Sequence, residues 1–500
     1  MTEKADPERT PVIVGVGQLN DRPDNPADGL DPIGLMTEAL KLADADAGGA
    51  LIADCDSLAV VSQIGWPQLS PVHHAVAERL RIEPAHCEQT EKPNGDSPTR
   101  LLHEAANRIG RGEARICAVT GGEALRTAAR LAALKSDGTK PNALRDASHR
   151  VRKGSAQSYG LVVPTDVYPL YENAMRATYG QTLAEGQAES GALWAGMSEV
   201  AAHSNGAWIK TPVTAHDVVN PTETNRPIAF PYTKLQVANA SVNQGAGFIV
   251  TSLAEAHRRG IPDERLVHIG YGAAASEPEN FLERADYTSS PSLETVLSEV
   301  LALNSVSSAD LDLVELYSCF PCVPKMARRV LEWPFDRPIT VHGGLTFGGG
   351  PIGNYMSHAV VEMVHRLRGS AKKGLLFANG GYATHNHAIV LSGFPLEATF
   401  PQSFDYQRQA DQRRGEIPPL DRDYEGPARI ETYTVFYAQD GLPKGGVVVA
   451  RTPDGARTLG RVAADDGPML DLLTGGEQEP VGRKGLLNRS KEGMAIWHSA

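Results

Sequence analysis

Hydrophobic and polar positions follow the same order in two halves of this chain. Residues 53–61 and 309–317 each come after an Ala- and Leu-rich stretch with helical spacing, and each becomes an apolar run of strand length. A second pair of matches follows. Residues 103–109 and 358–364 read as helices, and each precedes an apolar run that ends at a Gly-Gly pair. The pattern predicts two diverged copies of one β/α unit.

The repeated unit predicts a duplicated α/β core. Parallel strands need a crossover connection, which a helix supplies, so alternating β and α elements predict parallel sheets covered by helices. Two matches in the same order are difficult to attribute to chance similarity between Ala-rich helices. We therefore expect a first core half over residues 1–125 and a second over residues 227–395.

Three further segments do not share the repeat. Residues 126–226 separate the two halves and predict an inserted subdomain that lies over the core. Residues 396–427 are polar, charged and rich in proline, which is typical of a linker. Residues 428–500 contain short apolar runs separated by Gly, Pro and Asp turn signals, and this spacing predicts a small antiparallel β-barrel.

Composition narrows the classes of protein to consider. The 500 residues are enough for about three domains, and no apolar run reaches the ~18 residues that span a bilayer. The N-terminus is polar, unlike a signal peptide, so we expect a cytoplasmic protein. Five cysteines without a secretion signal favour reduced thiols. The net charge of -12 disfavours nucleic acid as a partner, because such binding depends on Lys and Arg neutralising phosphates.

One segment is basic against this acidic background. Between Arg126 and Lys153, eight Lys or Arg residues are opposed by two Asp residues. A solvated helix and loop would account for this charge, and so would a site for a phosphorylated ligand. Both interpretations stay open at this stage.

Chemistry is expected where strands end and helices begin, because ligands of open α/β sheets bind beyond the carboxyl ends of strands. Three such corners are prominent, at residues 93–99, 315–324 and 342–355. The third is rich in glycine, which would let a ligand approach backbone N–H groups at the start of a helix.

Taken together, these features resemble the thiolase superfamily over about residues 10–395. Residues 11–17 resemble its opening strand, residues 319–320 the end of the His-Asp-Cys-Phe motif of sterol-carrier-protein-type thiolases, and residues 343–351 the Gly-Gly…Gly-His-Pro loop. The thiolase-like protein type 1 group, which adds a C-terminal β-barrel, is the most similar. The resemblance implies a layered α-β-α-β-α fold, a homodimer, and an inserted loop domain that covers the active site and helps to bind coenzyme A.

Several positions that are catalytic in the family carry other residues here. The nucleophilic Cys falls on Gly95, and the His that activates it falls on Gly350. Tyr317 stands where an Asn or His holds a water, and a further thiolase Cys aligns near Ala378. Only Cys319 matches, at the acid/base Cys of the sterol-carrier type. We expect no ordinary thiolysis, because acid/base catalysis alone contributes roughly 10²–10⁴-fold and loss of the nucleophile removes most catalytic power.

The resemblance implies a CoA thioester as ligand, with no covalently bound cofactor. The phosphates at the nucleotide end of CoA need cationic partners, for which the segment offers Arg150, Arg152 and Lys153. Backbone contacts to the ligand are expected from Gly348, Gly349 and Gly350.

The remaining candidates leave alternatives open. Cys319 and Cys322 form a C-x-x-C pair that is interpreted as buried structural thiols, as a thiolase-type acid/base, or as a redox or metal pair. No second Cys pair completes a zinc site, so no metal is predicted. A helix starting near Pro321 would stabilise the Cys319 thiolate. His385 and His387 alternate on a predicted strand and share one face, either as a pair in the pocket or as packing residues.

The sequence as a whole predicts a thiolase-like acyl-CoA-binding protein of the acyltransferase class, acting in lipid metabolism with a degenerate active site. One alternative is a non-catalytic CoA-ester-binding or scaffold protein whose barrel contacts a protein partner. Another is a thiol redox protein that uses Cys319 and Cys322. Turnover separates the first two alternatives.

Overall fold

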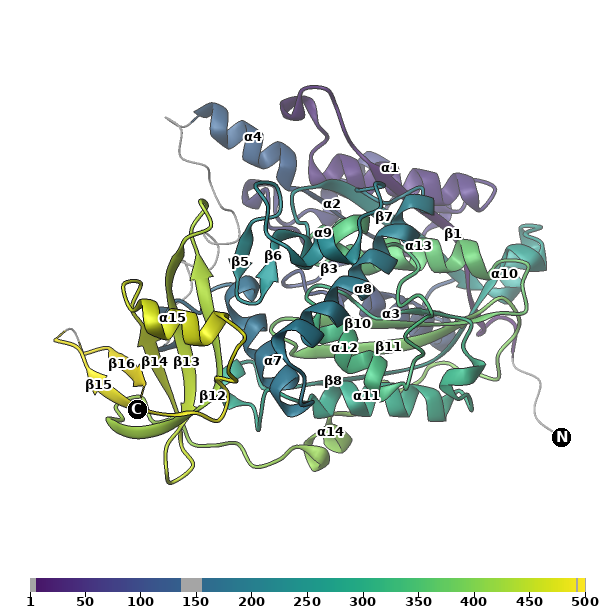
Figure 1. Cartoon of the computed structure of the whole chain (residues 1–500). Helices are drawn as coiled ribbons and strands as arrows, with labels where there is room; N and C mark the ends of the chain where they lie inside the picture. Colours follow the sequence, from purple (N-terminus) through teal and green to yellow (C-terminus); the bar gives the residue numbers. More distant parts are fainter. Residues whose placement is uncertain (1–5, 136–154, 492, 500) are drawn as a thin grey trace.

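The structure is a computed structural model that describes residues 6–135, 155–491 and 493–499 (Figure 1). Its core is one mixed sheet in the strand order β3-β2-β4-β7-β1-β8-β11-β10-β9. The strands are β1 (Pro11–Asn20), β2 (Ser57–Val60), β3 (His86–Gln89), β4 (Ile116–Ala124), β7 (Asn243–Ser252), β8 (Val267–Ser276), β9 (Leu313–Glu315), β10 (Lys373–Gly380) and β11 (His385–Ser392).

The sheet confirms the internal duplication. Strands β1, β2, β4 and β7 correspond in order and direction to β8, β9, β10 and β11. β7 therefore belongs to the first copy of the unit, although it lies within residues 227–395, the range expected for the second half. The two halves meet where β1 pairs with β8, at Val12 with His268 and Ile13 with Val267. The matched sequence segments lie on β2 and β9 and on the helices α3 (Ser97–Arg111) and α13 (Tyr355–Leu367).

The expectation of parallel sheets is correct for only part of the core. Strands β2, β3 and β4 are parallel, as are β9 and β10, whereas the inner strands pair antiparallel. The physical reason is visible at residues 381–384, which join β10 to β11. Four residues are too few for a helical crossover, so this connection has to be a hairpin.

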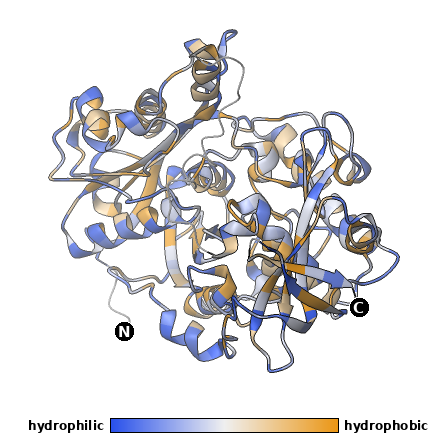
Figure 2. Cartoon of the chain, turned by 90° about the vertical axis from the view of Figure 1, so that its left-hand side faces the viewer, coloured by the Kyte–Doolittle hydropathy of each residue, from blue (hydrophilic) through white to orange (hydrophobic). Residues whose placement is uncertain are grey.

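Helices cover the sheet in layers. α3 and α13 pack on each other and on strands of both halves, so they form the central layer (Figure 1). One outer layer is α1 (Pro32–Asp46), which packs on β1, β4 and β7, and the other is α11 (Pro291–Leu303), which packs on β8 and β11. Figure 2 shows apolar residues (orange) along strands inside the molecule and polar residues (blue) on helices and loops at its surface.

α3 begins and ends for local reasons. Its first turn contains Pro98, whose missing N–H would be unpaired there in any case, and it ends at Gly112 in the left-handed region (φ +71). Asp96 is the residue before the helix, and the Ser97 hydroxyl accepts a hydrogen bond from the Asn94 N–H (3.0 Å). The short loop before α3 is thereby held in place.

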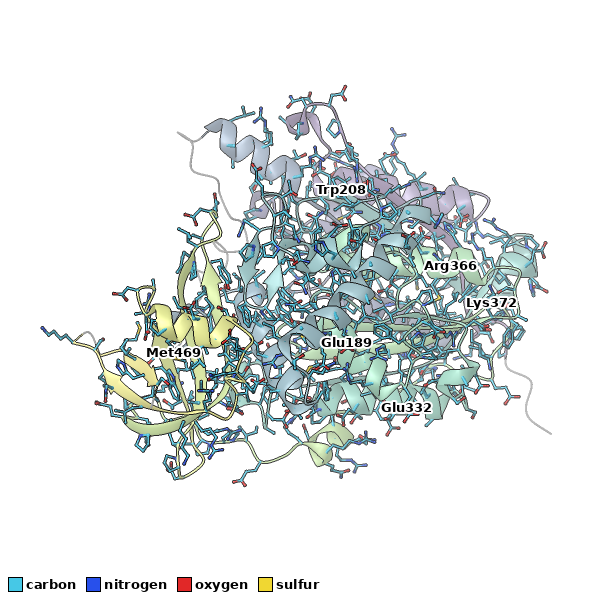
Figure 3. The ribbon with its side chains drawn as sticks, in the orientation of Figure 1. Glu189, Trp208, Glu332, Arg366, Lys372 and Met469 are labelled. Carbon is cyan, nitrogen blue, oxygen red and sulfur yellow. The ribbon has the colours of Figure 1, made fainter. Side chains whose placement is uncertain are left out.

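The inserted segment packs on the core, and its helix α7 (Pro164–Thr178) also packs on the C-terminal domain. Its described helices are α4 (Leu125–Lys135), α6 (Ser155–Ser158), α7 (Pro164–Thr178), α8 (Leu183–His203) and α9 (Ala215–Val219). Buried ion pairs join it to α12 (Cys322–Val330) of the core. Lys325 donates to Glu172 on α7 (2.5 Å), and Glu189 on α8 accepts from Arg328 (3.0 Å) and Arg329 (2.7 Å; Figure 3).

The C-terminal domain is a closed five-stranded barrel. Its strands are β12 (Gly426–Tyr437), β13 (Pro443–Arg451), β14 (Arg457–Val462), β15 (Lys484–Arg489) and β16 (Ala495–Ser499). They follow the order β13-β14-β16-β15-β12, and β12 pairs with β13 to close the barrel. The β14–β16 pair is parallel and the others are antiparallel. α15 (Gly467–Thr474) contributes Met469 and Leu473 to its apolar interior.

The barrel is fixed to the rest of the protein. Arg457 is fully buried and donates to the carbonyl oxygens of Leu282 and Arg284 (2.6 Å each) while it pairs with Glu431 (2.7 Å). The barrel sheet also continues into the residues that directly follow the inserted segment, because β12 pairs with β5 (Pro227–Ala229), which pairs in turn with β6 (Tyr232–Thr233).

The segment before the barrel is attached to the core as well. Gln402 and Asn107 exchange two hydrogen bonds (2.7 and 2.8 Å), and Ala274 of β8 bonds with the backbone of Phe404 and Tyr406. A short helix, α14 (Gln407–Arg413), follows. Among the described residues, no helix is both long and apolar enough to cross a membrane.

Candidate functional site

Two of the predicted corners meet at Gly95 and Tyr317. A Cβ atom at Gly95 would overlap the Tyr317 hydroxyl and the Asn379 carbonyl oxygen, and it would lie 2.5 Å from Tyr317 Cζ. Heavy atoms essentially never approach a real Cβ this closely. The Tyr317 phenol therefore fills the space that any side chain at position 95 would need.

The backbone of Tyr317 directs its ring to this place. Tyr317 follows β9 with φ +46, in the left-handed region that bulky residues rarely adopt and that stores about 1–3 kcal/mol of strain. Its ring meets that of Tyr355 edge-on, with 6.0 Å between centroids. Burial raises the pKa of the Tyr317 phenol well above its ordinary value, so the ring is present as a neutral phenol.

Cys319 lies next to this tyrosine and is enclosed. Its side chain is buried under α7, where the Tyr168 ring stacks on Phe320 at 4.3 Å. The Tyr168 hydroxyl is itself bonded to Asn379 and Gly381 (3.1 Å each). Burial raises the pKa of the Cys319 thiol to about 12, although a hydrogen bond with Tyr168 acts in the opposite direction. Desolvation thus outweighs the helix start, and the expected stabilised thiolate is not found.

The other thiol of the C-x-x-C pair and two thiols of the first half are also buried and have raised pKa values. Cys322 is the first residue of α12 and is fully buried, which raises its pKa well above the ordinary range. Burial also raises the pKa values of Cys55 and Cys117 to about 12. Cys87 differs, because it is only partly buried at the edge of the sheet. The geometry at Cys319 and Cys322 is that of enclosed neutral thiols.

The glycine-rich corner is occupied by contacts within the protein. Residues 344–348 form one π-helical turn, a feature often found near functional sites. The Gly348 carbonyl accepts from the Trp208 N–H (3.0 Å) and from Gln244 (2.9 Å), and the Gly350 N–H donates to the Asn239 carbonyl (2.8 Å). The Gly350 donor that would face a ligand is therefore already used. Gly349 (φ +99) is in a conformation that favours glycine.

A buried acid holds the start of this corner. Glu315, at the end of β9, accepts hydrogen bonds from the Thr340 hydroxyl (2.7 Å) and the Val341 N–H (3.1 Å). Thr340 in turn accepts from the N–H groups of Gly343 (2.9 Å) and Gly344 (3.1 Å). Burial raises the pKa of Glu315 to about 7, despite these hydrogen bonds.

A buried polar cluster that is not among the predicted site residues lies behind the glycine-rich corner. Ser204 lies 3.1 Å from His342 Nδ1 and donates to Glu362 (2.9 Å), which also accepts from Gln18 (2.8 Å). Gln18 bonds with His358 (2.8 Å), whose ring stacks on His342. Burial lowers the pKa of His342 to about 4, so the ring is neutral. The nearest sequence signal is that His342 directly precedes Gly343.

His385 and His387 both lie on β11, as predicted, but they have different partners. His387 is buried and lies 3.1 Å from His103 of α3, while His385 lies 3.1 Å from both Ser276 and Glu279. No described contact joins either ring to Cys319. Ala378 is buried on β10 directly opposite His387. Burial lowers the pKa of His387 well below its ordinary value and that of His103 to about 3.

The basic segment is only partly described. Arg150, Arg152 and Lys153 lie outside the described residues. Arg126, at its beginning, and Arg22, just after β1, both lie over the Trp208 indole, with their guanidinium carbons 5.7 and 3.8 Å from the ring centroid. Figure 3 labels Trp208.

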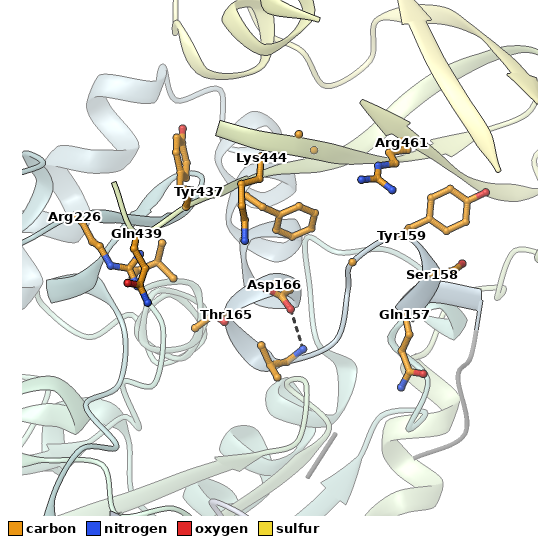
Figure 4. A pocket seen from close by; sticks show the side chains of 17 residues that line it. Gln157, Ser158, Tyr159, Thr165, Asp166, Arg226, Tyr437, Gln439, Lys444 and Arg461 are labelled. Carbon is orange, nitrogen blue, oxygen red and sulfur yellow. Dashed lines mark hydrogen bonds between the residues drawn. The ribbon is translucent and has the colours of Figure 1, made fainter. Parts of the chain in front are cut away.

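A separate cavity of about 600 Å³ opens between the inserted segment and the barrel (Figure 4). One wall is formed by residues 157–166, from α6 to the start of α7. The opposite wall is formed by strands β12, β13 and β14, which contribute Tyr437, Lys444 and Arg461. Asp166, on the first turn of α7, lines this cavity, and Tyr168 on the same helix contacts the surroundings of Cys319.

Comparisons with known proteins agree with this architecture. The domain described as "Thiolase-like protein type 1 additional C-terminal domain" matches residues 408–492. The crystal structure of a monomeric SCP2-thiolase like protein type 1 from Mycobacterium smegmatis is 30% identical, covers 99% of this chain and 100% of that chain, and has a TM-score of 0.83. A search of curated proteins finds no match.

More distant structures share the fold of the core. Human mitochondrial 3-ketoacyl-CoA thiolase in complex with CoA is 15% identical, with a TM-score of 0.57 over 78% of this chain and 99% of that one. An Ltp2–ChsH2(DUF35) aldolase is 20% identical, with a TM-score of 0.60 over 77% of this chain and 99% of that one. The similarity to the Mycobacterium smegmatis protein extends over both the duplicated core and the barrel. The chain therefore belongs to the SCP2-thiolase-like protein type 1 family.

Proposed function

We propose that this protein binds a CoA thioester and does not catalyse ordinary thiolysis. The observation that carries the proposal is the contact between Tyr317 and Gly95. In a thiolase the nucleophile at position 95 must be a Cys that carries the acyl group as a thioester, and here a phenol occupies that space. The CoA part is supported by the thiolase fold, since the human relative was crystallised with CoA.

The other groups of the site do not replace the missing nucleophile. Gly350 has no side chain to activate a thiol, and its N–H already donates to Asn239. A Cys319 thiol whose pKa is about 12 is protonated at neutral pH, so it would serve as a proton donor rather than as a base or nucleophile. The proposed role of Cys319 is therefore that of an acid at most, within a binding site of acyltransferase descent.

Three cations remain the proposed contacts to the phosphates of CoA: Arg150, Arg152 and Lys153. The acyl end would face the glycine-rich corner at Gly348, Gly349 and Gly350, and it would need contacts other than the Gly350 N–H, which already donates to Asn239. A role in lipid metabolism, a homodimer and a protein partner at the barrel also remain proposals. The Mycobacterium smegmatis relative is described as monomeric.

The experiment combines binding and turnover on the full chain. Calorimetry with CoA and acetoacetyl-CoA should show saturable binding, and a thiolysis assay at high enzyme concentration should show no cleavage. The triple change of Arg150, Arg152 and Lys153 to Ser should weaken binding and flatten its dependence on salt. Turnover on the order of 1–10³ s⁻¹ would refute the loss of thiolysis. Absence of binding by every CoA ester would refute the ligand class.

A further inference from the structure

The cavity between the inserted segment and the barrel carries uncompensated positive charge. Arg226, Lys444 and Arg461 line it, and among the described residues none of the three forms a salt bridge. Arg226 donates to the adjacent Pro227 carbonyl, and the one side-chain contact of Arg461 among the described residues is a weak one with the Met494 sulfur (3.7 Å). In Figure 4, Lys444 points across the cavity toward Asp166, while Arg461 lies near Tyr159.

One acid among the described lining residues, Asp166, holds the start of α7 and offsets part of this charge. The Asp166 carboxylate accepts from the N–H groups of Val162 (3.2 Å) and Val163 (3.0 Å), at the start of α7. These donors are at the positive end of the helix and stabilise the carboxylate. Three cations and one such carboxylate leave the cavity attractive to an anion.

Aromatic side chains complete the walls. Tyr159, Phe436 and Tyr437 all line the cavity. Gly160 lies against Phe436 with φ +95, and a Cβ atom there would come within 3.1 Å of the Phe436 ring. The ring is thus packed firmly on one side. Such rings offer flat apolar surfaces on which a heterocyclic base can stack, and guanidinium groups bind phosphates through paired N–H donors.

We propose that this cavity binds an aromatic base joined to phosphate, that is, a nucleoside phosphate. The volume of about 600 Å³ lies within the range of roughly 300–1,000 Å³ that is usual for small-molecule sites. The ligand is either a free nucleotide or the nucleotide end of CoA, and only the second source rests on the proposed function. In both cases Lys444 and Arg461, which belong to the additional C-terminal domain, contact the phosphates. The barrel then acts as one wall of a ligand site.

The test is calorimetry of the full chain with ADP, adenosine, inorganic phosphate and CoA. ADP should bind more tightly than adenosine or phosphate alone, because it engages both the rings and the cations. Changing both Lys444 and Arg461 to Ser should weaken ADP binding about 100-fold, since each of the two charge-assisted hydrogen bonds lost accounts for roughly tenfold. Lys484→Ser, which alters an exposed lysine on β15 of the same barrel, is the matched control and should leave ADP affinity unchanged.

The outcomes distinguish a free nucleotide from the nucleotide end of CoA as the ligand. They also test the nucleotide site separately from the proposed CoA-binding function. Weaker binding of both ADP and CoA in the Lys444/Arg461 variant would place the nucleotide end of CoA in the cavity. Weaker binding of ADP alone would identify a site for a free nucleotide. Failure of ADP to bind the wild-type protein, or equal affinity in variant and control, would overturn the inference. The CoA titration of the wild-type protein still reports on the proposed function in that case. Both altered side chains are exposed, and circular dichroism checks that the variant is folded.

Discussion

Replacing Glu315 with Gln should make the stability of this protein less dependent on pH. Glu315 is completely buried at the end of β9, and its Oε2 atom holds Thr340 and Val341 in place. A Gln carbonyl oxygen can accept the same two hydrogen bonds, so the variant resembles the protonated wild-type side chain at every pH. The comparison therefore isolates the ionisation of one carboxyl group.

The size and sign of the effect follow from the pKa. Burial raises the pKa of Glu315 from 4.5 to about 7, which corresponds to roughly 3 kcal/mol. As pH rises from about 4.5, the unfolded chain ionises at this residue while the folded protein stays protonated up to about pH 7. The protonated carboxyl makes its full contribution to the free energy of unfolding below pH 4.5. This contribution is lost as the pH rises from 4.5 to about 7. The loss amounts to about 1 kcal/mol at pH 5 and about 3 kcal/mol at pH 8.

The assay is urea unfolding, followed by tryptophan fluorescence, of wild type and Glu315→Gln between pH 5 and pH 8. The difference in unfolding free energy should move by about 2–3 kcal/mol in favour of the variant over this range. Other titrating groups are the same in both proteins and cancel. Glu83→Gln, at an exposed position just before β3, is the control and should show no such movement. A difference that stays constant with pH would refute the assignment of a raised pKa to Glu315.

Two further predictions concern the thiols and the barrel. Iodoacetamide should label the partly buried Cys87 of the native protein before the enclosed Cys319, and mass spectrometry of the peptides measures both rates. If Cys319 of the native protein is instead labelled rapidly and CoA esters suppress this labelling, the site opens to solvent. Arg457→Leu should lower the free energy of unfolding by about 3–5 kcal/mol, because it leaves Glu431 and the carbonyl oxygens of Leu282 and Arg284 without a buried donor. The control Arg451→Leu removes a more exposed partner of Glu431 and should lower the free energy of unfolding by about 1 kcal/mol or less. Equal thermal shifts of the two variants would contradict the role of Arg457 in holding the barrel.

Much of the architecture could be predicted from the sequence because it depends on local periodicity. The repeated apolar runs at residues 53–61 and 309–317 become the matching strands β2 and β9, and short runs with turn signals become the barrel strands. The replaced family positions, Gly95 and Gly350, are also visible in the sequence. Each of these features is encoded by residues close together in the chain.

Other properties arise only when distant segments pack together. The antiparallel inner strands depend on which runs pair across the sheet, and this pairing is not marked in any single run. The raised pKa of Cys319 results from burial under α7, more than a hundred residues away, and this burial outweighs the local helix start. Nothing in the glycine at position 95 reveals that Tyr317 fills its place. The tertiary structure decides these matters because desolvation and steric exclusion depend on three-dimensional neighbours rather than on sequence neighbours.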